Sequence, residues 1–145
     1  MVELQLLQRG ESYAALLESL PEHELYHDRG SRLPIDYTYE VVLINRRIAA
    51  RVGGVTPPEL PPMPIVAPEF FRERQLAADE VRESTKAIVE AWDESGDGGA
   101  LDLVPPTDEP TTRLELALIA LWHLGYHEGQ LSVVAQQSGS STADR

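Results

Sequence analysis

Apolar residues recur every three or four positions in four stretches of the chain, a spacing that places them on one face of an α-helix. In the first stretch, residues 2 to about 20, the apolar side consists of Leu6, Tyr13, Leu17 and Leu20. Gly10 interrupts this stretch, and a glycine inside a helix costs about 1 kcal/mol relative to alanine. The helix is therefore expected either to bend at Gly10 or to begin near Ser12, which would cap it.

The second and third stretches carry longer apolar faces. Residues 34–52 are expected to form a helix ending at Gly53-Gly54, with an apolar side made of Tyr37, Val41, Ile44, Ile48 and Val52. Residues 69–95 are expected to form the longest helix, beginning after Pro68, with an apolar side made of Phe71, Ala78, Val81, Thr85, Ile88 and Trp92. The glycine-rich residues 95–99 are expected to end that helix.

The last helix is expected to run to about Gln137. Thr111 or Thr112 is a suitable N-cap, and Glu115 completes a capping-box pattern with Thr112. Residues 139–145 consist of Ser, Gly, Thr, Ala and charged side chains, a composition typical of a flexible tail.

The connection between the second and third helices is rich in proline. Residues 56–68 contain Pro57, Pro58, Pro61, Pro62, Pro64 and Pro68, which exclude helix and favour extended backbone. Extended residues advance about 3.1 Å each, so this segment can travel the length of a bundle and let the third helix run parallel to the second. No stretch shows sustained β-alternation. The pattern predicts an all-α four-helix bundle with a long Pro-rich crossover between helices 2 and 3, built as one domain from residues 1–138.

Composition and charge narrow the classes of function. The 145 residues include 24 acidic and 12 basic side chains, for a net charge of −12, and no basic stripe that could follow a phosphate backbone, so nucleic-acid binding is not expected. The chain has no Cys, which excludes a catalytic thiol and thiolate ligands. Residues 1–5 lack the features of a secretory signal, and no run approaches the roughly 18 apolar residues of a membrane span, so a cytoplasmic location is expected.

Two histidines in the last predicted helix are the strongest candidates for chemistry. His123 and His127 are four residues apart, so both imidazoles face the same side, a geometry that chelates metal ions. Gln130 falls on the same stripe, together with Leu116, Ile119 and Val134. A single buried histidine is usually a hydrogen-bonded core residue. A pair at this spacing instead favours a divalent ion, because unpaired polar groups are costly to bury.

Three other features invite a functional interpretation. His23 and His27 have the same spacing but lie among acidic residues in a short segment, which favours a solvated linker over a metal site. Asn45 interrupts the apolar side of the second helix, where it could bond a neighbouring polar group or face the histidines. Gly125 and Gly129 lie on the side of the last helix away from the histidines and would allow another helix to approach closely.

The stretch from His123 to Leu131, His-Leu-Gly-Tyr-His-Glu-Gly-Gln-Leu, resembles the last helix of the DinB/YfiT-like superfamily. The likeness extends to the expected layout of four helices with a long connection after the second. Such proteins commonly hold a nickel or zinc ion with three histidines, two from this motif and one from the middle of helix two. Many form homodimers, and characterised members include transferases and isomerases that use low-molecular-weight thiols such as bacillithiol or mycothiol.

Carried onto this chain, the resemblance implies a metal site made by His123 and His127, with Asn45 at the position expected to hold the third histidine. Gln130 and Glu128 are candidates for the second layer around the metal, as is Tyr126. The first hypothesis is a divalent-metal-binding protein acting as a metal-dependent transferase or hydrolase with an external thiol, its catalytic residues unassigned. The alternative is a metal-free, non-enzymatic bundle that acts by dimerisation or by binding a small ligand, with the histidines hydrogen-bonded to Asn45 or Tyr126.

Overall fold

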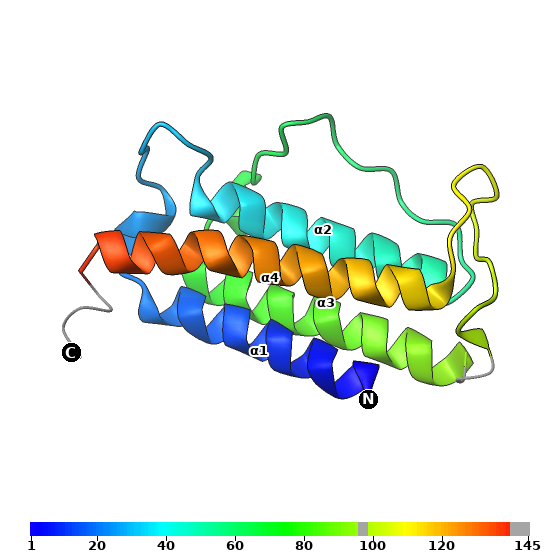
Figure 1. Ribbon diagram of the computed structural model, residues 1–145. Helices are drawn as coiled ribbons and strands as arrows, with labels where there is room; N and C mark the ends of the chain where they lie inside the picture. The colour runs from blue at the N-terminus through cyan, green and yellow to red at the C-terminus, as the bar shows by residue number, and fades with distance from the viewer. Residues whose placement is uncertain (96–98, 140–145) are drawn as a thin grey trace.

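The computed structural model describes residues 1–95 and 99–139, and in this part of the chain it is built from helices with one isolated β-bridge, between Leu103 and Thr112. The elements are α1 (Val2–Ser19), the 3₁₀ turn η1 (Glu22–Leu25), α2 (Pro34–Val52), the 3₁₀ turn η2 (Glu69–Phe71), α3 (Arg74–Ser95) and α4 (Arg113–Gln137) (Figure 1). The predicted all-α four-helix bundle is confirmed. The expectations for the end of the third helix beyond Ser95 and for the tail beyond Gly139 concern residues 96–98 and 140–145, which lie outside the described residues.

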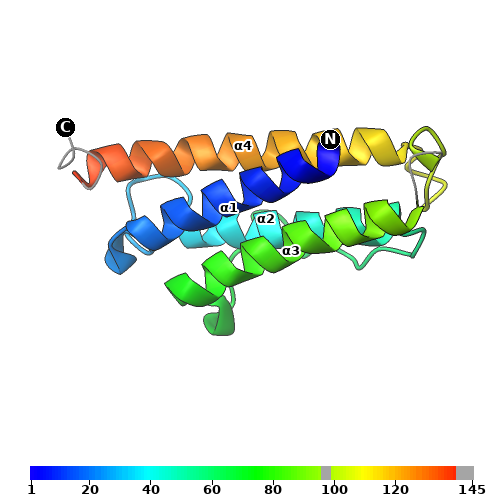
Figure 2. The same cartoon turned by 90° about the horizontal axis from the view of Figure 1, so that it is seen from below.

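The direction of the helices confirms the role of the crossover. α2 and α3 run the same way along the bundle, joined by the long Pro-rich segment, while α1 and α4 run the opposite way (Figure 1). α3 packs against α1 and α2, and α4 packs against the same two helices from the other side (Figure 2). Each helix therefore has one parallel and one antiparallel neighbour. α2 and α4, which carry the candidate site, are an antiparallel pair.

α1 is continuous through Gly10, so the expected start near Ser12 is wrong. The reason is packing between α1 and α3: Gly10 is buried, and a Cβ placed on it would lie 2.6 Å from Oγ1 of Thr85. The missing side chain lets the two helices approach closely. The hydroxyl of Ser12 donates to Glu128 on α4 at 2.6 Å instead of capping a helix.

The ends of the helices follow local capping rules. α2 has the predicted bounds, and Gly54 beyond its end has a φ of 75°, a backbone conformation that suits glycine. The capping box of Thr112 and Glu115 is present at the start of α4. α3 begins at Arg74 rather than residue 69, because the carboxylate of Glu73 accepts the backbone N–H groups of Gln75 and Leu76 and starts the helix there.

The interior consists of two apolar clusters with polar residues between them. One cluster includes Tyr13, Val41, Val81 and Leu131, and the other includes Leu6, Ile48, Ile88 and Leu116. Asn45 on α2 lies between the two clusters, and its amide donates to Ser84 at 3.1 Å and to Thr85 at 3.4 Å on α3.

Polar contacts also tie the crossover to α2. The Asp36 carboxylate accepts the backbone N–H of Ala67 at 2.8 Å, and Arg32 donates to the carbonyl of Ile65 at 3.0 Å.

In the described part of the chain, no helix is both long enough and apolar enough to cross a membrane.

One residue of the predicted apolar stripe of α4 is not buried. Leu116 and Val134 are buried as expected, but Ile119 is 46% exposed. α4 contacts only α1 and α2 extensively, so the part of its surface that is covered is narrower than the apolar pattern suggests.

Candidate metal centre

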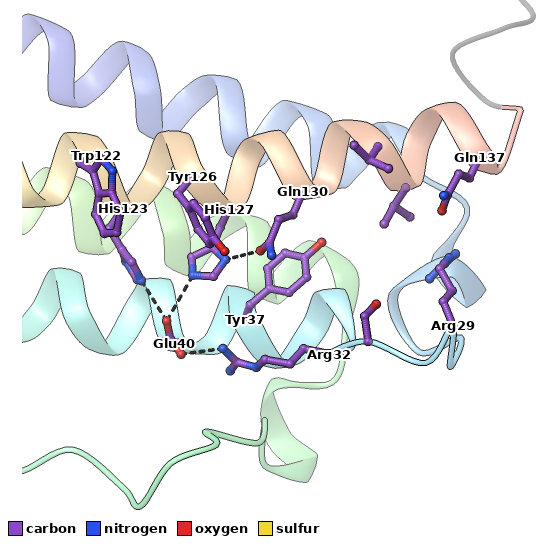
Figure 3. Close-up of a pocket in the computed structure, with 13 residues that line it drawn as sticks. Arg29, Arg32, Tyr37, Glu40, Trp122, His123, Tyr126, His127, Gln130 and Gln137 are labelled. Atoms are coloured by element: carbon purple, nitrogen blue, oxygen red, sulfur yellow. Dashed lines mark hydrogen bonds and ion pairs between the residues drawn. The ribbon is translucent and has the colours of Figure 1, made fainter.

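Three buried side chains from two helices meet at one point: Glu40 of α2 and His123 and His127 of α4 (Figure 3). The Oε2 atom of Glu40 lies 2.9 Å from Nε2 of His123 and 3.2 Å from Nε2 of His127. One ligand atom from each residue falls within 4.8 Å of the others. This group can hold a metal ion.

The surroundings of the three residues fix their orientation. Arg32, which precedes α2, donates to the other carboxylate oxygen of Glu40 at 2.8 Å. The rings of Tyr37 and His127 stack, with centroids 5.1 Å apart and planes 10° from parallel. The two imidazoles are nearly perpendicular, with centroids 4.6 Å apart. These contacts leave the imidazole nitrogens little freedom to turn away from Glu40.

The contact between His127 and Gln130 decides which nitrogen of His127 carries the proton. Oε1 of Gln130 lies 2.6 Å from Nδ1 of His127 and can only accept, so Nδ1–H donates to it. In the neutral imidazole, Nε2 then has a free lone pair that faces an oxygen of Glu40. Two acceptors at this distance repel, and either a second proton on His127 or a metal ion between them removes the repulsion. The second arrangement is the usual one for a metal-binding histidine whose outer N–H is held by an acceptor.

The pKa values of Glu40 and His123 are shifted, and both shifts favour the protonation state that binds metal. Burial alone would raise the pKa of Glu40, but hydrogen bonds from His123 and Arg32 outweigh it and lower that pKa to about 2. Burial lowers the pKa of His123, against the opposing effect of the bond to Glu40. At neutral pH the carboxylate is thus ionised and His123 is neutral, as metal binding requires.

The distances fit a small divalent ion. Bonds of about 2.0–2.2 Å in a tetrahedral site keep ligand atoms roughly 3.3–3.6 Å apart. The two contacts of Glu40, at 2.9 and 3.2 Å, need to lengthen by about 0.1–0.7 Å to reach that separation. Two histidines and one carboxylate form a donor set known for zinc and for other first-row divalent metals.

The structure does not bring all the expected site residues together. Asn45 is fully buried against α3 and is not among the residues that line the pocket beside the histidines. Glu128 points to α1, where it accepts from Arg9 at 3.1 Å and from Ser12. Gln130 contacts His127 as expected of a second-layer residue, and Tyr126 packs edge-on against the same ring at 5.0 Å. The residue of α2 that lies beside the two histidines is Glu40, five residues before Asn45, the position where the third ligand was expected.

The sequence could have marked Glu40 as a second candidate beside Asn45, without deciding between them. Glu40 lies three residues after Tyr37 and four before Ile44, on the apolar side of α2. A carboxylate in such a stripe needs a partner, and the histidines supply one.

The second pair of histidines behaves as predicted for a solvated segment. His23 is 74% exposed in its side chain and contacts Glu24 at 3.0 Å, and His27 is exposed. Neither belongs to a metal-binding cluster among the described residues.

Comparison with known proteins supports the fold. No protein-family model matches the chain, and no curated protein sequence matches it significantly. Among solved structures, the chain is similar to a DinB-like protein from Bacillus cereus ATCC 10987, with a TM-score of 0.70 and 21% sequence identity. The match covers 90% of this chain and 86% of that chain. The DinB-like fold expected from the last helix is therefore confirmed, and at this identity the likeness concerns the fold alone.

Proposed function

We propose that this protein, which has the fold of a DinB-like protein, binds a divalent metal ion through Glu40, His123 and His127. One observation carries the proposal: Nε2 of His127 lies 3.2 Å from Oε2 of Glu40 inside the buried group, and the other nitrogen of this imidazole contacts Oε1 of Gln130. With the proton on the nitrogen that faces Gln130, two acceptors face each other, and a cation between them satisfies both. Zinc or nickel suits two imidazoles, and the carboxylate completes the set.

The activity that we propose for the metal-bound protein is a transferase or hydrolase reaction with a low-molecular-weight thiol. When bound, a divalent ion would act as a Lewis acid that lowers the pKa of a thiol or water. The chain has no Cys, so the thiol would come from outside, and a pocket of about 840 Å³ beside Glu40 offers room for it. The activity is tested by conjugation of cysteine to monochlorobimane, and equal rates with and without metal-loaded protein would contradict it.

Metal binding itself is tested on untagged protein supplied with Zn²⁺ or Ni²⁺ and then desalted. We expect about one equivalent per chain by mass spectrometry of the metal content, whereas less than about a tenth would contradict the proposal. The variant Asn45→Ala should keep the metal, although it loses about 1–3 kcal/mol of stability because buried hydrogen bonds to Ser84 and Thr85 are removed. Loss of metal from a folded Asn45→Ala variant would indicate that Asn45, rather than Glu40, is the third ligand.

A second candidate function, self-association, is favoured by the outer side of α4, at the near face of the bundle in Figure 1. The exposed residues of α4 from 118 to 137 include no charged side chain, whereas α3 exposes Asp79, Glu83, Lys86, Glu90, Asp93 and Glu94. Five large apolar side chains lie on this side of α4 with exposures between 46% and 66%: Leu118, Ile119, Trp122, Tyr126 and Val133. Gly125 and Gly129 lie among them, and apart from the chain neighbours and the nearby backbone of α4, no atom of the described residues lies within 4 Å of a Cβ placed on either.

We propose a second copy of the chain as the partner of this face. Each copy carries a charge of −12, so the repulsion between two copies is smallest when they meet at a face that brings no carboxylates together. An uncharged apolar helix can pair with itself about a two-fold axis, with the glycines allowing close approach. The proposal does not depend on the metal.

The substitution Ile119→Glu should weaken the dimer by at least about 100-fold, because it places two carboxylates in the interface. Light scattering during size-exclusion chromatography should give twice 16.1 kDa for the parent protein and 16.1 kDa for the variant. Val55→Glu adds the same charge at a residue that is 60% exposed in the crossover, and it should leave the dimer intact. A parent protein that is monomeric at all concentrations, or a dimeric Ile119→Glu variant, would refute the interface.

A further inference from the structure

The pocket beside the candidate metal centre extends well beyond the three ligands. It has a volume of about 840 Å³ and lies between α4, the first half of α2 and the segment that precedes α2. His123 and Trp122 lie at one end, Tyr37 and Gln130 in the middle, and Arg29 and Gln137 at the other end (Figure 3). This volume exceeds what an ion needs and suits a small organic molecule.

The middle of the pocket contains a buried donor without a partner. Tyr37 is 3% exposed, and its hydroxyl has no hydrogen-bond partner among the described residues. The hydroxyl of a tyrosine carries a proton at neutral pH and can donate it. Two other tyrosine hydroxyls in the first half of the chain are buried: that of Tyr13 contacts Thr38 at 2.7 Å, and that of Tyr26, which does not line the pocket, also has no hydrogen-bond partner among the described residues. Because Tyr37 lines the pocket, its buried hydroxyl without a partner is a candidate donor to a ligand oxygen.

Further donors line the same pocket. Oε1 of Gln130 accepts from His127, which leaves the amide NH₂ of Gln130 available to a ligand. The pocket is lined by two arginines, Arg29 and Arg32, and one carboxylate, Glu40, although the chain as a whole has twice as many acidic as basic residues. Glu40 is already held by Arg32 and the two histidines. Both arginines are also paired, Arg29 with Glu24 and Arg32 with Glu40, so among these side chains the donors without a partner are the hydroxyl of Tyr37 and the amide NH₂ of Gln130.

The walls around these donors are apolar. Trp122 and Tyr126 stack with ring centroids 5.6 Å apart, the ring of Tyr37 covers His127, and Val133 and Val134 line the same side. A ligand that fits such walls has a hydrocarbon or aromatic body, while the donors require an oxygen acceptor, best a negatively charged one.

We propose that the pocket binds a small molecule with an apolar body and a carboxylate group, and that the carboxylate accepts hydrogen bonds from Tyr37 and Gln130. The inference rests on the proposed metal site, because the end of the ligand away from the carboxylate would lie beside Glu40, His123 and His127. It adds the class of ligand, and it assigns Tyr37 as a binding residue.

The test uses 3-phenylpropionate and its uncharged amide, 3-phenylpropanamide, titrated calorimetrically into zinc-loaded protein. The carboxylate should bind at least about tenfold more tightly than the amide, since hydrogen bonds to charged groups are worth about 1.5–3 kcal/mol. Tyr37→Phe removes the hydroxyl alone and should weaken 3-phenylpropionate by about tenfold or more. The variant should keep its zinc content and its melting temperature, because the hydroxyl has no protein partner to lose.

A matched control separates this role from a general effect of losing a tyrosine hydroxyl. Tyr39→Phe changes a tyrosine that packs against Phe70 and Phe71 outside the pocket, and it should leave 3-phenylpropionate binding unchanged. Equal binding of acid and amide, or unchanged binding in Tyr37→Phe, would overturn the inference while leaving the metal site intact. If the protein takes up no metal, the proposed function fails. In that case, binding of 3-phenylpropionate to the metal-free protein tests the ligand site on its own. Weaker binding by Tyr37→Phe supports the ligand site, and equal binding by the parent and Tyr37→Phe overturns it.

Discussion

Replacing Glu40 with alanine should lower the affinity for Zn²⁺ by at least about 100-fold, the upper end of what the loss of a second-layer residue costs. Glu40 supplies the single contact from α2 that closes the site formed by His123 and His127. Without it, two imidazoles on one helix remain, and a divalent ion keeps only half of a tetrahedral coordination shell. Competition with a chromogenic chelator measures the change directly.

Two further variants make this result specific. Glu80→Ala removes a carboxylate of α3 that pairs with Arg46 at 2.6 Å on the surface, and zinc binding should not change. Glu40→His replaces the carboxylate with a third imidazole and should restore binding, with a preference shifted toward nickel and zinc. If Glu40→Ala kept the parent affinity, the metal would have to lie elsewhere.

The thermal stability of these variants provides an independent readout. A ligand that binds only the folded state raises the melting temperature, so zinc should stabilise the parent protein and Glu80→Ala. The same addition should leave Glu40→Ala unchanged. The metal-free proteins must be compared as well, because Glu40 also binds Arg32 and its removal alters the apoprotein.

The sequence was sufficient to predict the helices and the histidine pair, since both follow from spacing alone. The stripe from Tyr37 to Val52 gave the bounds of α2, and the four-residue spacing placed His123 and His127 on one buried side. The parallel run of α2 and α3 followed from the length and proline content of the crossover (Figure 1). Each of these features is local, so a single chain segment determines it.

The third member of the site depended on contacts between segments. Asn45 and Glu40 both interrupt the apolar side of α2, and five residues on a helix turn a side chain by more than a right angle. Which of them faces α4 depends on how α2 is rotated within the bundle. In the structure, the amide of Asn45 donates hydrogen bonds to Ser84 and Thr85 of α3. Glu40 faces the histidines, with Arg32 beside it. Arg32 precedes the helix, so helical periodicity could not reveal its contribution.

Replacing Gly10 with alanine should destabilise the protein by about 1–3 kcal/mol, as expected for overpacking of a close helix contact. Helix propensity alone predicts the opposite sign, because alanine is better than glycine by about 1 kcal/mol inside a helix. The steric clash outweighs this gain in helix propensity, because the new Cβ would lie 2.6 Å from Oγ1 of Thr85 and 2.9 Å from two of its carbons. Thr85 cannot easily turn away, since its hydroxyl donates to the carbonyl of Val81 at 2.7 Å. Urea denaturation with an unchanged slope measures the loss.

The control for this change is Gln8→Ala, on the exposed side of the same helix, which should alter stability by less than about 0.5 kcal/mol. A Gly10→Ala variant at least as stable as the parent would mean that α1 and α3 can separate freely. The folded Gly10→Ala variant should also bind Zn²⁺ with the parent affinity, because Gly10 meets Thr85 of α3, whereas the metal ligands lie on α2 and α4. Loss of stability without loss of metal binding in Gly10→Ala, together with loss of metal binding in folded Glu40→Ala, would show that packing of α1 on α3 and the α2–α4 site are energetically separate.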